Sequence, residues 1–231
     1  MTNSTTKRRT AGRVAFFASV LVAIVATTAL TVLALVLPEA RTQTLFEETG
    51  PFEQASPWLW LAFALWIPVV FRKPTRTVAA GMIVAIAAAA REWDWHKAFT
   101  DYSVLKLPFY YREGTVPERL VAGGVMVLVI ASVVVLIARL VQLKPWKRPI
   151  TWWAYALVFA FGMLAFTKVI DRAPAILQDD FGITVGDRLR LVAYAVEEGL
   201  EMVLPLFFVA YTVALARWHA ARPPAGESQQ T

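Results

Sequence analysis

The sequence predicts an all-α membrane protein, a bundle of six transmembrane helices with both termini in the cytoplasm. The chain has 231 residues and is 58% hydrophobic, which is more apolar than ordinary soluble domains. Its apolar residues fall into six stretches that approach the roughly 20 residues needed to cross a bilayer. The basic residues gather on one side of these stretches. Short connections leave no room for a separate soluble domain.

Taken in order, the predicted spans are Val14–Leu37, Pro57–Phe71, Thr77–Ala90, Leu120–Leu143, Ile150–Thr167 and Leu191–Arg217. The first is longer than the ~7–15-residue core of a secretion signal, so we expect a retained anchor. The second and third are short and need flanking residues to complete a crossing. We therefore divide the chain into a cytoplasmic tail (1–13), a membrane domain (14–217) and a disordered cytoplasmic tail (218–231).

Charge predicts the orientation of the bundle. Thirteen of the 23 Lys and Arg residues fall in the two tails and in the loops after the second and fourth spans. Of the 17 carboxylates, only Glu227 falls on that side. Lys and Arg in short loops mark the cytoplasmic face, so we expect a multi-pass protein of the bacterial inner membrane. The topology also explains the net charge of +6 without nucleic-acid binding.

The last span carries acidic residues where hydrocarbon is expected, in the stretch AYAVEEGLEMVLP. The 15 residues from Met202 to Ala216 span about 22 Å of helix, against an apolar core about 30 Å thick. Glu201 is therefore expected roughly 8 Å below the outer boundary of the core. Spacings of three and four residues place Tyr194, Glu197, Glu198 and Glu201 on one stripe. Such carboxylates need protons, a bound cation or basic partners, because burial and like charge disfavour ionisation.

A second polar group follows the third span, in the stretch REWDWHKAFTDY. If the helix continues outward, Glu92 and His96 share a face, with Asp94 and Lys97 on an adjacent one. A carboxylate and an imidazole one turn apart are typical ligands of Zn, Mn or Fe. At the outer end of the fifth span, Lys168, Asp171 and Arg172 are candidate counter-ions or anion-binding groups.

Three chemistries remain open for these residues. The first is a divalent metal ion held by Glu92, His96, Glu198 and Glu201. The second is proton or organic-ligand chemistry at the same groups. The third is structural ion pairing of the glutamates with Lys168, Arg172, Arg188 or Arg190.

Two resemblances add to this reading. The tetrapeptide EGLE, Glu198 to Glu201, resembles part of the Arg-Glu-Gly-Leu-Glu signature of high-affinity iron permeases, whose paired glutamates are thought to handle iron. Here Glu197 replaces the arginine, and a single copy is present. The combination of RExDxHKxFT with a later EExxE resembles uncharacterised small polytopic bacterial membrane proteins, which implies no activity.

Our leading functional hypothesis is cation- or proton-coupled transport through an outward-facing acidic site. One alternative is a membrane-embedded enzyme acting on a lipid, with a metal-bound water activated by Glu92 or Glu198. Another is an assembly protein whose charges only tie helices together. The expected partners are the lipid bilayer and a small cation or lipid ligand, and the oligomeric state is left open. The sequence contains no phosphate-binding glycine loop, nucleophile elbow or dinucleotide fingerprint.

Overall fold

The computed structural model describes residues 2–47, 50–98, 100, 102–143 and 151–220, with side chains described from Gly12 onward. The elements are helical, and the described part of the chain contains no strand. In chain order they are α1 (Thr2–Val36), α2 (Glu39–Phe46), α3 (Pro51–Phe71), α4 (Arg76–Glu92), α5 (Trp95–Ala98), η1 (Phe109–Glu113), α6 (Val116–Leu143), α7 (Trp152–Asp179) and α8 (Asp187–Ala220). The predicted all-α class is confirmed.

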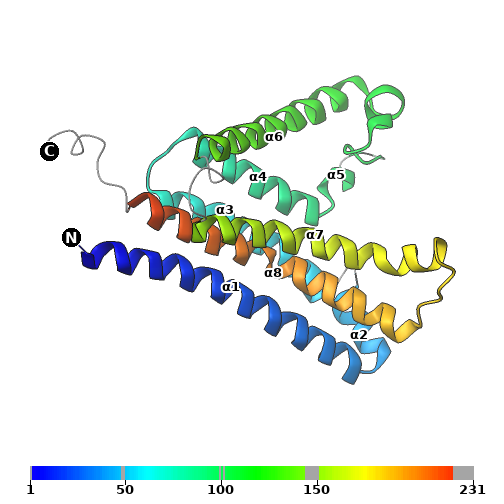
Figure 1. Ribbon diagram of the computed structural model, residues 1–231. Coiled ribbons are helices and arrows are strands. Elements are labelled where there is room, and N and C mark those ends of the chain that lie inside the picture. Colours follow the sequence, from blue (N-terminus) through cyan, green and yellow to red (C-terminus); the bar gives the residue numbers. More distant parts are fainter. Residues whose placement is uncertain (1, 48–49, 99, 101, 144–150, 221–231) are drawn as a thin grey trace.

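Five of the described segments are long and apolar enough to cross a bilayer. They are Gly12–Val36, Glu39–Phe71, Val116–Leu143, Trp152–Asp179 and Asp187–Ala220. The one remaining predicted span, the third (Thr77–Ala90), corresponds to α4, which has 17 residues and is about 26 Å long, slightly shorter than a hydrocarbon core of about 30 Å. The start of α1 and the end of α8 lie at the same end of the bundle (Figure 1).

The first and last helices extend into the segments predicted as tails. α1 begins at Thr2, so most of the predicted N-terminal tail continues the first helix. α8 ends at Ala220, so the first three residues of the predicted C-terminal tail are helical. The rest of that tail, 221–231, lies outside the described residues.

The centre of the bundle is α8, which packs against α1, α3 and α7 (Figure 1). Its N-terminal half meets α1 and α2 in a cluster that includes Leu30, Phe46 and Leu200. Its middle packs on α1 and α7 through Leu204 and Phe207. Because it has neighbours on several sides, α8 presents different residues to different helices.

The C-terminal end of α1 is held to α8 by an arginine. The Arg188 guanidinium donates hydrogen bonds to the carbonyl oxygens of Leu35 and Leu37, the latter at 2.7 Å. The last carbonyls of a helix have no partner within the helix, and a cation there also interacts favourably with the negative end of the helix dipole. Arg188 therefore stabilises the end of α1.

In contrast, α6 lies at the edge of the bundle. It packs along α4, and its last turn reaches the cluster around Trp153 through Leu143. Most of its apolar side chains are exposed, including Val121, Val127 and Ile130. In a bilayer this surface faces lipid.

Candidate functional site

The acidic residues of α8 lie in a buried layer of the bundle. Glu197 and Glu201 are each only 9% exposed, and Glu198 is partly buried. Gly199 between them sits directly against Leu30 of α1. This glycine leaves room for α1 on one side of α8. The three glutamates instead interact with charged groups of the other neighbours, α3, α4 and α7.

Lys168 of α7 is the basic partner of this layer. Its Nζ lies 2.5 Å from Oε1 of Glu201 and 3.7 Å from Oε1 of Glu197. The lysine side chain remains 39% exposed, whereas both glutamate side chains are 11% exposed. The ammonium group is thus held between two buried carboxylates while its side chain reaches the surface. Lys168, one of the candidate counter-ions, thus forms ion pairs with two glutamates of α8.

The acidic group of α4 belongs to the same layer. Oγ of Ser56, on α3, donates a hydrogen bond of 3.2 Å to Oε2 of Glu92, and Arg91 lies 3.5 Å from Oε1. Glu92 is also within electrostatic range of Glu201 and Lys168. The acidic ends of the third and sixth predicted spans therefore lie within electrostatic range of each other.

Glu198 interacts through its charge with acidic groups of α3 and α4. It is within electrostatic range of Glu53 of α3 and Glu92 of α4, in addition to its neighbours in α8. We use the name carboxylate cluster for Glu53, Glu92, Glu197, Glu198 and Glu201. These carboxylates share one region with Lys168 and the exposed Arg91.

His96 lies apart from this arrangement, which corrects one expectation. α4 ends at Glu92, and Asp94 adopts a left-handed conformation with φ of 53°. Aspartate tolerates this conformation better than most residues, so the chain turns there and the helix stops. The predicted continuous helix that places Glu92 and His96 on one face is therefore wrong.

The residues after this turn pair with each other. Asp94 is 2.9 Å from Nζ of Lys97 and 3.6 Å from Nδ1 of His96. Burial lowers the pKa of His96 below its ordinary value of 6.5, although Asp94 acts in the opposite direction. A lowered pKa keeps this imidazole neutral at pH 7.

The other predicted counter-ions take different roles. Arg172 lies 3.6 Å from Asp171 on its own helix and is largely exposed, while Asp171 acts on Glu197 through its charge. Arg190 donates to the Val185 carbonyl and to Oε1 of Gln178. Tyr194 packs beside the apolar cluster of α1, α2 and α8. Lys168 is the one predicted counter-ion that contacts the glutamates of α8 in the described part of the chain.

Ser56 and Glu53 were missed by sequence reasoning. The second span was predicted to begin at Pro57, whereas α3 begins at Pro51 and carries both residues one turn apart. A serine and a glutamate at i, i+3 spacing, directly before an apolar run, were the available signal.

Within the described residues, no group of three or more His, Asp or Glu side chains is arranged to hold a metal ion. The metal centre of Glu92, His96, Glu198 and Glu201 stays a prediction. No family model, curated protein or solved structure matches the chain. The resemblances to iron permeases and to small polytopic bacterial membrane proteins likewise stay predictions.

Proposed function

We propose that this membrane protein exchanges protons or a small cation at the carboxylate cluster as part of transport. The observation that carries the proposal is the position of Lys168, whose Nζ lies between Oε1 of Glu201 and Oε1 of Glu197. Two buried carboxylates with a cation between them form a binding site in which the protein supplies its own cation. A proton on Glu201, or an external cation, competes with the lysine for the same oxygen.

The balance of charge supports exchange rather than permanent pairing. Lys168 and Arg91 together carry fewer charges than Glu92 and the three glutamates of α8, and burial makes uncompensated charges costly. Additional protons or cations are therefore needed for the cluster to be stable. Ionisable groups inside membrane bundles commonly mark proton relays and ion paths. The exposed stem of Lys168 gives this ammonium group a route to move when Glu201 is neutralised.

The test compares Glu201→Gln with wild-type protein and with Glu113→Gln, which removes an exposed carboxylate outside the cluster. Infrared difference spectra of purified protein should show a carboxyl band that appears on acidification and is lost in Glu201→Gln alone. Proton entry into proteoliposomes, followed with an internal pH dye, should fall at least tenfold in the same variant. Identical bands and fluxes in all three proteins would reject the proposal.

A second candidate is a structural role, which the short distance between Lys168 and Glu201 favours. The exchanged pair Lys168→Glu/Glu201→Lys separates the two roles. If ion pairing is the only role of these residues, the exchange should restore the stability that each single substitution removes, together with any growth defect that it causes. Restored stability without proton uptake supports the transport role.

We further propose that both termini are cytoplasmic in a bacterial inner membrane, because basic residues gather at the end of the bundle where α1 begins and α8 ends. The chain has no cysteine, so single cysteines report orientation without a background. In intact cells, an impermeant maleimide should label Tyr111→Cys and should label Lys73→Cys only after permeabilisation. The reverse pattern would overturn this orientation.

A further inference from the structure

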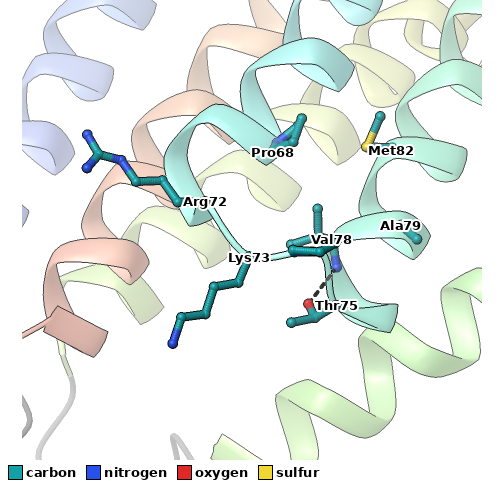
Figure 2. A pocket seen from close by; sticks show the side chains of 8 residues that line it. Pro68, Arg72, Lys73, Thr75, Val78, Ala79 and Met82 are labelled. Atoms are coloured by element: carbon teal, nitrogen blue, oxygen red, sulfur yellow. Dashed lines mark hydrogen bonds between the residues drawn. The ribbon is translucent and has the colours of Figure 1, made fainter.

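A cavity of about 260 Å³ opens at the turn between α3 and α4 (Figure 2). The carboxylate cluster lies toward the opposite ends of these helices, where Glu53 and Glu92 are found. One wall is apolar and comes from both helices. The side chains of this wall are Pro68, Val78, Ala79 and Met82. Arg72 and Lys73 line the cavity at the turn itself.

Local hydrogen bonds fix the backbone at both ends of this turn. Arg72 has φ of 53°, and its N–H donates to the carbonyl of Pro68 at 2.9 Å, which closes the end of α3. Oγ1 of Thr75 accepts a hydrogen bond from the Val78 N–H at 3.2 Å, which caps α4 (Figure 2). The backbone of the turn is therefore fixed, and with it the positions of the Cα atoms of Arg72 and Lys73.

Charge at this turn is of one sign. Arg72, Lys73 and Arg76 are exposed, and the segment from 72 to 76 contains no acidic residue. In Figure 2 the Arg72 and Lys73 side chains extend from the turn in different directions and away from Met82, while Pro68 and Met82 lie between the helices. An anionic group at the turn would therefore meet cations, with apolar surface immediately behind it.

The size of the cavity indicates what kind of ligand fits. Pockets that enclose a small molecule have volumes of roughly 300–1,000 Å³, so this cavity holds only part of a ligand. Leu65 of α3, one turn before Pro68 on the same face of the helix, is 68% exposed and extends the apolar surface beyond the cavity. A ligand with an anionic head and an apolar chain that runs on along the helix matches both features.

We propose that this cavity is a binding site for one anionic phospholipid. The phosphate lies at Arg72 and Lys73, and the first part of an acyl chain lies against Pro68, Val78 and Met82. Basic pockets between transmembrane helices on the cytoplasmic side bind anionic headgroups in this way. The site is independent of the proposed exchange at the carboxylate cluster.

The test is native mass spectrometry of the purified full chain with phosphatidylglycerol, and with phosphatidylcholine of the same acyl chains. Arg72→Gln/Lys73→Gln should weaken retention of phosphatidylglycerol by about 20- to 30-fold, since each basic residue near a membrane surface contributes about fivefold. Arg139→Gln/Arg217→Gln is the matched control. It removes two exposed basic residues from the same predicted membrane side but away from the cavity. Arg72→Lys/Lys73→Arg should retain the lipid.

A second variant tests the apolar half. Ala79 is exposed at the rim, and Ala79→Trp should fill the cavity and weaken phosphatidylglycerol severalfold while helix content stays unchanged by circular dichroism. Equal losses in the two Gln pairs would show general surface attraction and overturn the proposal. Undiminished binding in Ala79→Trp, or equally tight binding of inorganic phosphate alone, would also overturn it.

Discussion

α6 and α8 were both predicted as membrane spans, yet they occupy opposite kinds of environment. Only 6% of the most apolar stretch of α6 is buried inside the bundle, whereas 56% of the most apolar stretch of α8 is buried. The more apolar helix is therefore the more exposed one. In a bilayer, lipid is as apolar as a side chain, so apolarity does not select the interior.

Polar groups distinguish the two helices better than apolar ones. α8 carries Glu197 and Glu201, which meet Lys168 of α7, and Thr212, which meets Trp66 of α3. In α6 the buried hydroxyl of Ser132 donates to the Leu128 carbonyl of its own helix. A polar side chain in lipid needs a partner, and a partner on another helix must come from inside the bundle. The polar face therefore marks the central helix.

The strongest way to break this comparison is to remove the basic partner of the cluster. Lys168→Met leaves Glu197 and Glu201 buried without their cation, which we expect to lower the free energy of unfolding by about 3 kcal/mol. On α6, Ile130→Met changes a side chain that is 54% exposed and should alter it by less than about 0.5 kcal/mol. Reversible unfolding in mixed micelles measures both.

The double variant Lys168→Met/Glu201→Gln serves as the control for that result. Removing both charges eliminates the buried unpaired carboxylate, so most of the lost stability should return. A double variant as unstable as Lys168→Met would show that lost packing of the lysine stem, rather than unpaired charge, causes the effect.

The sequence predicted the chemistry of α8 better than its surroundings. Helical spacing alone placed Glu197, Glu198 and Glu201 together, because the helix is regular there. Lys168 was named because it lies with Asp171 and Arg172 at the end of the fifth predicted span, on the same side of the membrane as the glutamates. His96 was misplaced because the chain turns at Asp94, and a left-handed aspartate leaves little trace in hydropathy.

The neighbours of each helix were beyond sequence reasoning. The roles of Ser56 and Glu53 depend on α3 packing beside α4 and α8, and no periodicity in a single span encodes that packing. The peripheral position of α6 was equally hidden, since its composition suits either lipid contact or an apolar core. Pairing between helices is set by shape and by partners far along the chain.

A glycine on each helix sharpens the comparison by packing rather than charge. A Cβ at Gly199 would overlap the side chain of Leu30 on α1, whereas a Cβ at Gly124 of α6 meets nothing within 4 Å. Gly199→Ala should therefore destabilise the protein by about 1–3 kcal/mol through overpacking. Gly124→Ala should be neutral or stabilise it by up to about 1 kcal/mol, because alanine favours the helix.

The double variant Gly199→Ala/Leu30→Ala provides the matched control. If overlap with Leu30 is the cause, shortening that leucine relieves it, and Gly199→Ala should cost less in this background than in wild type. Equal costs in both backgrounds would place the strain elsewhere in α8. A loss of stability in Gly124→Ala as large as in Gly199→Ala would contradict the peripheral position of α6.

The smallest expected difference concerns two hydroxyl groups. Thr212 accepts a hydrogen bond of 3.2 Å from Nε1 of Trp66 on α3, so Thr212→Val breaks a contact between helices while keeping the shape of the side chain. Such bonds contribute about 0.6 kcal/mol on average in membrane proteins, and the loss should be of that order. Ser132→Ala on α6 removes a 2.8 Å bond within one helix and should change the free energy of unfolding by much less. Trp66→Phe should cost little further once Thr212 is valine, and a full additional loss would show that the two groups act separately.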